Sequence, residues 1–433
     1  MKKVMLKTTL SLAVTLASSQ IFASGFALNE QSVSGMGTGF AGRSSSADDA
    51  STVFGNPAGM SRLSGQQVTG GIAVIDASTD IKDANGSIKG TNKGDMVPFT
   101  GVPMGFYTNK LNDQWAVGFG VYAPFGLVTD YESSFQGRGF GSKSEVKVVT
   151  LQPTVSYAFN DRVSIGFGPT INRIAGTLES ELRLTPNPLA GAGDSNVKIK
   201  GDDTALGFNA GILVQATDTT RVGLTYHSKV KYKLEGHTNV TASSDPFTAA
   251  RLKSNRYDAT LKIDTPESWD LSVTQEINDA WKVYAGSTWT RWSRLKDITV
   301  QNEGVTAAAG GGAAPALFTT IKEEQNWHDT WAYAIGTSYQ LNKQWVLRTG
   351  LTWDQSPTNN ENRSPRIPTG DRTIFSLGAG YAVNENLTID AAYSYLKEES
   401  VKVDDQKAAL GSYYSSKYEN SANGFAVGAT YKF

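Results

Sequence analysis

The chain contains no cysteine among its 433 residues and only three histidines. The lack of cysteine excludes disulfide bonds, thiol nucleophiles and cysteine-ligated metal sites. The histidines, His227, His237 and His328, form no H-E-x-x-H motif, and the sequence contains no G-x-S-x-G motif. An enzyme is one class of function to be weighed. A lipid hydrolase that acts in a membrane needs a serine and a histidine on its membrane-facing surface, whereas the residue alternation around His227 predicts that this side chain faces the interior of the fold. We therefore expect no catalytic residue, no cofactor and no metal.

The sequence also lacks a charge imbalance and, beyond its first residues, a long apolar run. Forty basic residues oppose 41 acidic residues, for a net charge of −1, which argues against a nucleic-acid partner. After residue 23 no stretch of about 20 apolar residues is present that could form a transmembrane helix. The apolar segment 10–16 follows Lys2, Lys3 and Lys7, and this arrangement is typical of a secretory signal peptide. We expect the signal peptide to span residues 1–23, with cleavage after Ala23.

What the mature chain does have is a strict alternation of short and long connectors. The short ones are rich in Asn and Asp and are predicted to be tight turns at 109–113, 160–161, 216–219, 278–279, 342–343 and 384–386. The long ones are rich in Gly, Ser, Asp and Asn and lie near 80–96, 125–144, 182–196, 236–256, 302–320, 356–370 and 401–419. A transmembrane β-barrel has its turns on one side of the membrane and its loops on the other. The connectors thus predict about fourteen strands.

The runs between the connectors have the period of a barrel wall. Val163, Ile165 and Phe167 alternate with Ser164 and Gly166, so that one face is apolar and the other small or polar. A soluble β-sandwich has the same alternation, but its strands are shorter than these runs of roughly ten to twenty residues. Aromatic residues also cluster beside the short turns, as in an interfacial girdle: Trp115, Tyr157, Phe159, Trp281, Tyr339, Trp345 and Tyr381. The predicted fold class is all-β, a transmembrane antiparallel up-and-down β-barrel.

Residues 24–65 do not alternate and are rich in Gly, Ser and Ala. The segment 37–42 has the spacing G-x-G-x-x-G, but it lacks the preceding strand of the βαβ unit that dinucleotide binding requires. We interpret residues 24–65 as a helical or irregular hatch that plugs the lumen of a barrel spanning residues 66–433. A disordered periplasmic tail is the alternative.

Several short motifs make the chain similar to a known family. The sequences G-F-A-L-N-E at 25–30, A-D-D-A at 47–50 and N-P-A at 56–58 resemble the hatch of the FadL family, the outer-membrane long-chain fatty acid transporters. The motifs P-E-S-W at 266–269 and W-T-R-W-S at 289–293 extend the resemblance over essentially the whole mature chain. The resemblance implies a fourteen-stranded, monomeric barrel with a hatch in the Gram-negative outer membrane.

The resemblance further implies passive uptake of long-chain fatty acids or of another hydrophobic small molecule. Close relatives take up aromatic or alkane hydrocarbons, and no residue of this sequence decides between these substrates. The expected surroundings are outer-membrane lipid and lipopolysaccharide, and the terminal Phe433 resembles the signal that the barrel assembly machinery recognises. A general water-filled porin without a hatch is the third class, and a large stable aqueous conductance would favour it.

In the implied path, loops capture the substrate, a pocket above the hatch holds it, and a kink in the third strand releases it sideways. Glycine and proline weaken a strand ladder, so we place this gate at Gly118, Gly120 and Pro124, although such glycines also simply relieve crowding. The hatch and loop residues expected to bind substrate are Phe26, Asn56, Pro57, Ala58, Phe125, Leu127, Phe135 and Phe140. The alternative for the loop residues is that they only pack against one another.

A carboxylate head group needs a cation in the pocket, as the resemblance also implies. Arg173 is one candidate, but its parity points outward unless Pro169 introduces a bulge. Lys322 and His328 are the others, and by parity both face inward near the top of their strand. For each of the three, a solvated or snorkelling side chain is the alternative.

Overall fold

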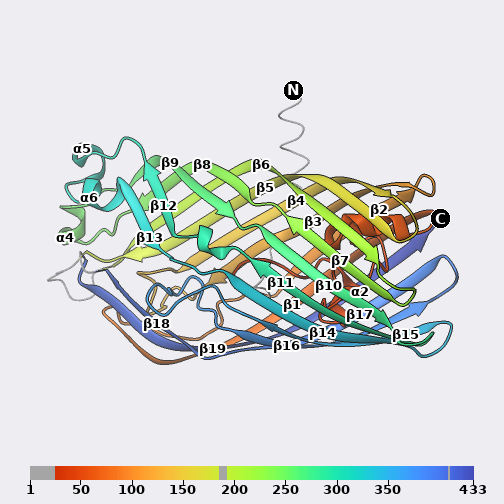
Figure 1. Ribbon diagram of the computed structural model, residues 1–433. Coiled ribbons are helices and arrows are strands. Elements are labelled where there is room, and N and C mark those ends of the chain that lie inside the picture. Colours follow the sequence, from red (N-terminus) through yellow and green to blue (C-terminus); the bar gives the residue numbers. More distant parts are fainter. Residues whose placement is uncertain (1–24, 185–192, 408–409) are drawn as a thin grey trace.

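The computed structural model describes residues 25–184, 193–407 and 410–433, so the expected signal peptide lies outside the described residues. Within them, strand segments β1 to β19 form one antiparallel sheet that closes on itself, because β1 pairs with both β2 and β19 (Figure 1). Five strands are each divided into two segments, at β7–β8, β9–β10, β11–β12, β13–β14 and β17–β18. The barrel therefore has fourteen strands, and the prediction from the connectors is confirmed.

The first strands are β1 (Gln66–Gly86), β2 (Thr100–Lys110), β3 (Trp115–Asp130), β4 (Lys143–Ala158), β5 (Val163–Leu182), β6 (Ser195–Gln215), β7 (Thr220–His227), β8 (Val230–Thr241), β9 (Asn255–Thr265) and β10 (Ser268–Glu276). The remaining strands are β11 (Trp281–Thr290), β12 (Asp297–Asn302), β13 (Thr320–Glu324), β14 (Thr330–Gln340), β15 (Trp345–Asp354), β16 (Arg372–Ala382), β17 (Leu387–Glu398), β18 (Val401–Lys407) and β19 (Ser412–Lys432). The helices are α2 (Val33–Gly37), α3 (Thr52–Gly55), η1 (Pro57–Arg62), α4 (Pro246–Ala249), η2 (Trp292–Arg294), α5 (Ala307–Gly310) and α6 (Ala314–Phe318).

The two ends of the barrel differ as the connectors predict. All six short connectors are tight turns of four residues between strands, and they gather at one end of the barrel, while α4, α5 and α6 lie in the loops at the other end (Figure 1). Three of the predicted girdle pairs are direct cross-strand neighbours beside the turns. Their ring centroids are 4.8 Å apart for Trp115 with Tyr157, 4.6 Å for Trp281 with Tyr339 and 4.7 Å for Trp345 with Tyr381.

The outer face of the barrel is apolar where a soluble protein would be polar. Phe167, Leu271 and Ile335 expose 47, 49 and 61% of their surface, and each lies on an outward face between small or polar inward neighbours. A β-sandwich would bury these residues in its core, whereas a barrel presents them to lipid. Among the described residues, no helix has the length and apolar character needed to cross a membrane.

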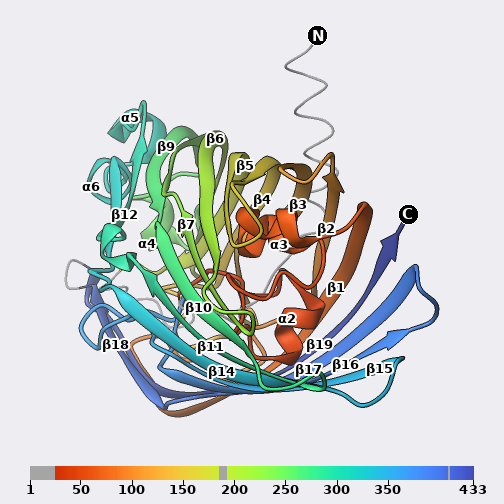
Figure 2. The ribbon, with the colours of Figure 1, turned by 45° about the vertical axis from the view of Figure 1, so that its right-hand side comes forward.

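The hatch, residues 25–65, lies inside the ring of strands (Figure 2). Two of its three described short helices, α2 and η1, begin at side-chain caps, because Ser32 accepts a hydrogen bond from the N–H of Gly35 and Asn56 accepts one from the N–H of Ala58. The hatch is bonded to the wall, since Asn56 donates to the carbonyl of Ile212 over 3.0 Å and Thr225 donates to that of Gly55 over 2.8 Å. These bonds hold one flank of the hatch against β6 and β7.

The extracellular end is closed by loop side chains that pack into the lumen. Arg366 is buried and donates to Glu323, to Ser144 and to the carbonyls of Lys143 and Glu179, so that the loop 356–370 is joined to three strands. The barrel is thus filled at both ends, by the hatch at the turn end and by the loops at the other, and a space remains between them.

Candidate functional site

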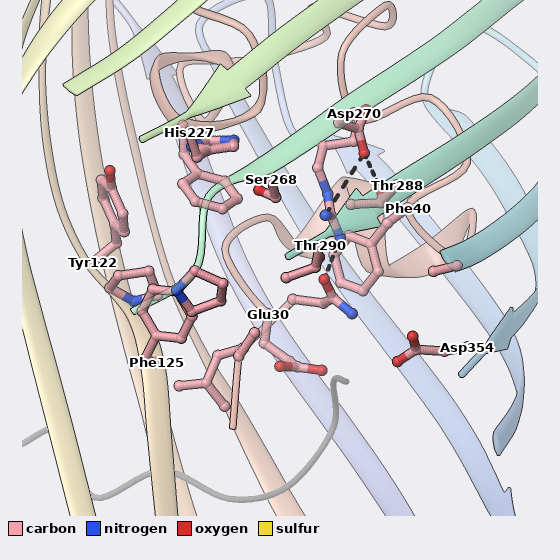
Figure 3. Close-up of a pocket in the computed structure, with 18 of the residues that line it drawn as sticks. Glu30, Phe40, Tyr122, Phe125, His227, Ser268, Asp270, Thr288, Thr290 and Asp354 are labelled. Atoms are coloured by element: carbon pink, nitrogen blue, oxygen red, sulfur yellow. Dashed lines mark hydrogen bonds and ion pairs between the residues drawn. The ribbon is translucent and has the colours of Figure 1, made fainter. Parts of the chain in front are cut away.

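A cavity lies between the hatch and the upper barrel wall, with an empty volume of about 1330 Å³ that includes space open to solvent. Figure 3 shows Tyr122 and Phe125 on one side of it and Asp270, Thr288 and Phe40 on the other, with Glu30 of the hatch between them.

The lining of the cavity is divided between apolar and hydrogen-bonding groups. The apolar part comes from Leu28, Phe40, Phe54, Phe125, Val230, Ala332, Ala334 and Ile374. Hydroxyl and amide groups come from Thr150, Thr170, Asn172, Asn209, Ser268, Thr288, Thr290, Thr352, Ser376 and Ser394. These polar residues are the inward positions of the strands, and most of them are buried. The cavity therefore suits a molecule that is mostly apolar but carries a polar group.

Arg43 is the only arginine or lysine among the described residues that line this cavity. Its Nη2 donates to Oδ1 of Asn29 over 2.5 Å, and its guanidinium lies 5.2 Å from the centre of the Phe40 ring. The ion pair of Nη1 with Oδ2 of Asp270 is long, 3.8 Å, because Asp270 also accepts a bond of 2.6 Å from Thr288. The buried Nε of Arg43 has no hydrogen-bond partner among the described residues. The guanidinium therefore has donors to offer to an anion in the cavity.

Glu30 lines the same cavity and is 5% exposed. Its Oε2 has no hydrogen-bond partner among the described residues. Burial raises the pKa of this carboxyl to about 7, and the backbone N–H groups of Asn29 and Glu30 and the charges of Arg43 and Arg372 partly oppose the shift. The cavity thus contains an acid that can be neutral close to physiological pH.

The segment before Glu30 completes the edge of β3. Regular pairing of β3 with β2 ends at Val121 with Gly105, and the register with β4 shifts between Tyr122 and Phe125. Above this point the hatch supplies the bonds, because the N–H of Leu28 donates to the carbonyl of Pro124 over 2.8 Å. The carbonyl of Phe26 in turn accepts from the N–H of Gly126 over 2.8 Å. The start of the hatch therefore occupies a strand edge that β2 leaves free.

Phe26 fixes this segment in an aromatic box. Its ring centroid lies 4.8 Å from that of Trp292, 5.8 Å from Phe125 and 6.0 Å from Trp327, and Phe26 is 3% exposed. Gly25 precedes it at a φ of +66°, where an added Cβ would lie 2.7 Å from the Trp327 ring. The described chain thus begins packed against the cavity wall.

A second, almost wholly apolar hollow of about 570 Å³ lies nearer the loops. Its inward apolar side chains come from β4, β5, β6, β8, β9 and β12 and include Val146, Ile174, Ile199, Leu234, Leu261, Ile263, Ile298 and Val300. One buried apolar cluster contains Val146, Ile174 and Leu234 of this hollow together with Phe125 and Val230 of the cavity. An apolar wall therefore connects the two spaces.

Comparisons with known proteins agree with this architecture. The family described as "Outer membrane protein transport protein (OMPP1/FadL/TodX)" matches residues 14–433. The chain belongs to this family. It is 29% identical over 462 residues to a long-chain fatty acid transport protein of Escherichia coli, covering 100% of this chain and 99% of that protein.

Solved structures of the family have the same fold. A FadL homologue of Pseudomonas aeruginosa superposes with a TM-score of 0.84 at 28% identity, covering 95% of this chain and 100% of that one. The toluene transporter TbuX of Ralstonia pickettii superposes with a TM-score of 0.68 at 20% identity, covering 92 and 97% of the two chains. As a family member, the chain is an outer-membrane protein that transports hydrophobic compounds.

The cations expected from the sequence lie outside the cavity. Arg173 faces outward and pairs with Asp202 over 2.8 Å, because the pairing of β5 with β4 and β6 contains no bulge at Pro169. The prediction that Lys322 faces inward is wrong, since its neighbour Glu323 is the one that meets the buried Arg366.

Lys322 faces outward because the strand that contains it is interrupted. Ala332 and Ala334 of β14 line the cavity, so even-numbered residues face inward in β14. Residues 325–329 lie between β13 and β14 and belong to neither strand. The alternation of β14 therefore does not continue into β13, where the odd-numbered Glu323 faces inward. His328 lies in this interruption and is exposed, so the prediction that it faces inward is wrong too.

The expected hatch and loop residues divide into those at the cavity and those in packed cores. Phe125 lines the cavity, while Phe26 and Leu127 pack beside it in one buried cluster. Phe135 and Phe140 are buried in a separate loop cluster, where the Phe135 ring stacks on Tyr131 at 3.8 Å. Asn56, Pro57 and Ala58 are buried where the hatch meets β5 and β6: Asn56 donates to Ile212, and Ala58 accepts from Ser164.

The kink of β3 lies at Ala123 and Pro124, so it coincides with Pro124 of the expected gate and lies above Gly118 and Gly120. Gly118 and Gly120 pair regularly with β4. A Cβ at Gly118 would lie 2.5 Å from Sδ of Met60, so this glycine gives the hatch room to approach the wall. Pro124 lines the cavity at the kink itself.

Sequence reasoning missed Arg43 and Glu30 as cavity residues. Both lie in the non-periodic hatch, where no alternation shows which way a side chain points. The one available signal was chemical: a carboxylate and an arginine in a segment predicted to fill an enclosed lumen.

Proposed function

We propose that this protein is a passive channel for the uptake of long-chain fatty acids across the outer membrane. The extracellular loops capture the substrate, the cavity above the hatch holds it, and it then leaves sideways at β3 or into the periplasm. The observation that carries the proposal is the composition of the cavity: apolar walls for a hydrocarbon chain, with a single guanidinium and many hydroxyl groups for its head. No energy source is needed, because movement down a concentration gradient suffices.

The apolar hollow near the loops supports the first step. A fatty acid that reaches the barrel can lie against Ile199, Leu261 and Val300 there and then move along the shared apolar cluster to Phe125. Burial of its chain drives both steps, at about 0.8 kcal/mol for each methylene group removed from water.

Arg43 is the head-group cation in this proposal, in place of Arg173, Lys322 and His328. Its Nε lacks a partner among the described residues and its pairing with Asp270 is loose, so a carboxylate can take up bonds that the protein leaves unmade. Phe26, Asn56, Pro57 and Ala58 then serve to hold the hatch, and Phe135 and Phe140 to shape the loops.

Sideways release would use the upper edge of β3, above Gly118 and Gly120 and beside Pro124. There the hatch segment 26–28, and no part of β2, supplies the hydrogen bonds. Displacement of this short segment would expose the edge without breaking the rest of the barrel.

Uptake of aromatic or alkane hydrocarbons is the alternative within the family, and it is favoured by the fold shared with a toluene transporter. A neutral hydrocarbon, however, would leave the buried Nε of Arg43 without a partner among the described residues, which a binding site that offers an unpaired donor penalises. A general porin is disfavoured, because the hatch and the loops fill both ends of the lumen. We further propose that the protein acts as a monomer, contacts lipopolysaccharide in the outer leaflet, and is recognised by the barrel assembly machinery through Phe433.

Uptake of labelled oleate and toluene tests the proposal in a strain without its own transporter. We expect the chain to restore oleate uptake and to have little effect on toluene; the reverse would support the hydrocarbon alternative. Arg43→Gln should weaken oleate binding to the purified protein by about 10- to 100-fold, the loss of about 1.5–3 kcal/mol from a charged hydrogen bond. Arg173→Gln is the matched control and should bind like the wild type.

A further inference from the structure

A fatty acid that leaves the barrel sideways enters hydrocarbon, and there its charge is the obstacle. An ionised carboxylate in an apolar medium is far less stable than the neutral acid, so such groups accept a proton instead of entering charged. The inference that follows rests on the proposed function, because it concerns the same cavity and the same substrate.

Glu30 has the position that a proton donor at this exit requires. It lies between two residues that bind the kink of β3, because the N–H of Leu28 donates to Pro124 and Nε2 of Gln31 donates to the carbonyl of Ala123 over 2.6 Å. It lines the cavity together with Arg43, and Asn29, its neighbour in the chain, receives the hydrogen bond from Arg43. The Glu30 carboxyl and the Arg43 guanidinium thus belong to the lining of one cavity, and the charge of Arg43 acts on Glu30.

We propose that Glu30 donates a proton to the carboxylate of a fatty acid bound at Arg43, so that the substrate leaves as the neutral acid along the upper edge of β3, which the hatch segment 26–28 covers until it is displaced. The O–H bond of Glu30 breaks, and a new O–H bond forms on a carboxylate oxygen of the substrate. The Glu30 carboxylate that remains takes over the negative charge beside Arg43, and water in the solvent-accessible cavity returns a proton to it before the next cycle.

The surrounding charges are compatible with this exchange. Arg43 and Arg372 are the cations that act on Glu30, and Tyr122, His227, Asp270 and Asp354 are the other titratable groups among the described residues of the cavity lining. Asp354 lies 3.9 Å from Nε of Arg372, and Asp270 accepts from Thr288, so both acids are already engaged. Because burial raises the pKa of Glu30 to about 7, the protonated and ionised forms of this carboxyl are both populated near neutral pH, which supports the assignment.

The test compares an acid with an alcohol of the same chain. Initial uptake of labelled oleate and of oleyl alcohol is measured in cells that carry the wild type, Glu30→Gln or Asp48→Asn, at about pH 6 and about pH 8, on either side of the Glu30 pKa. Asp48→Asn is the matched control, because it removes a carboxylate from an exposed part of the hatch that does not line the cavity. Binding of oleate to each purified protein is measured in parallel.

We expect Glu30→Gln to lower the ratio of oleate to alcohol uptake at pH 6 by about tenfold or more, a conservative figure for a positioned general acid. Binding of oleate to the variant should persist. Between pH 6 and pH 8, the ratio of oleate to alcohol uptake should fall in the wild type by more than the ionisation of free oleate accounts for. In Glu30→Gln the ratio should fall by no more than that. An unchanged ratio, or an equal loss for both probes, would overturn the proposal while leaving fatty acid uptake intact. If the wild type takes up neither probe, the proposed function fails and the inference with it.

Discussion

Gly223 on β7 is one of the positions where the hatch approaches the barrel wall so closely that even one methyl group does not fit. An added Cβ would lie 1.8 Å from the carbonyl oxygen of Ser44 and 2.3 Å from its carbonyl carbon. Ordinary contact between such atoms needs about 3.5 Å, so Gly223→Ala must push this part of the hatch away by about 1.7 Å.

The cost can be worked out from the bonds that such a shift breaks. Ser44 donates to the carbonyl of Gly223 over 3.0 Å, its N–H donates to Ser272 over 3.1 Å, and its carbonyl accepts from Asn56 over 2.7 Å. At about 1 kcal/mol for each lost bond, Gly223→Ala should reduce the free energy of hatch opening by about 3 kcal/mol. Alanine is tolerated in a strand, so the barrel itself should fold.

Hydrogen exchange of hatch residues 40–60 and conductance in planar bilayers measure the effect. Exchange in the hatch should speed up by about 100-fold, and openings that admit hydrophilic ions should become frequent. Gly105→Ala is the control, because a Cβ on Gly105 would meet no atom within 4 Å. If Gly223→Ala matches the Gly105→Ala protein in both assays, the hatch is not held by this contact, and the reasoning is refuted.

Two further predictions concern the segment that covers β3. Phe26→Ala removes three ring contacts of about 0.5–1.5 kcal/mol each, so the fluorescence emission of Trp292 should move to longer wavelength. Phe99→Ala is the control, because Phe99 is 69% exposed and its loss should leave the emission unchanged. Burial raises the pKa of Glu30 from 4.5 to about 7 in the folded state. The contribution of Glu30 to the stability of the folded segment is therefore complete below pH 4.5 and is lost as the pH rises through 7. The intrinsic-rate-corrected exchange of residues 26–31 should therefore accelerate between pH 6 and 8 in the wild type but not in Glu30→Gln, and equal pH dependence of the two proteins would contradict this assignment.

The alternation of residues along a strand predicts which side of the barrel wall a side chain lies on, and two residues show where this prediction holds and where it fails. Parity placed Arg173 on the outer face, and the structure agrees because the pairing of β5 contains no bulge there. The same reasoning failed for Lys322, since the interruption at 325–329 exchanged the inward and outward positions of one strand. Alternation is reliable only as far as the strand is continuous, and no local signal announced that break.

The sequence by itself determined the closed barrel and its fourteen strands, because side-chain alternation and connector length are local properties that survive without knowledge of long-range contacts. For residues 24–65 it supported a plug but left a disordered tail as the alternative. Only the tertiary structure decided which groups meet in the cavity. Arg43, Glu30 and Asp270 are far apart or non-periodic in the chain, and they come together because the hatch folds back into the lumen against strands that follow it by up to hundreds of residues. The chemistry of this protein is thus set by how one irregular segment fills a regular wall.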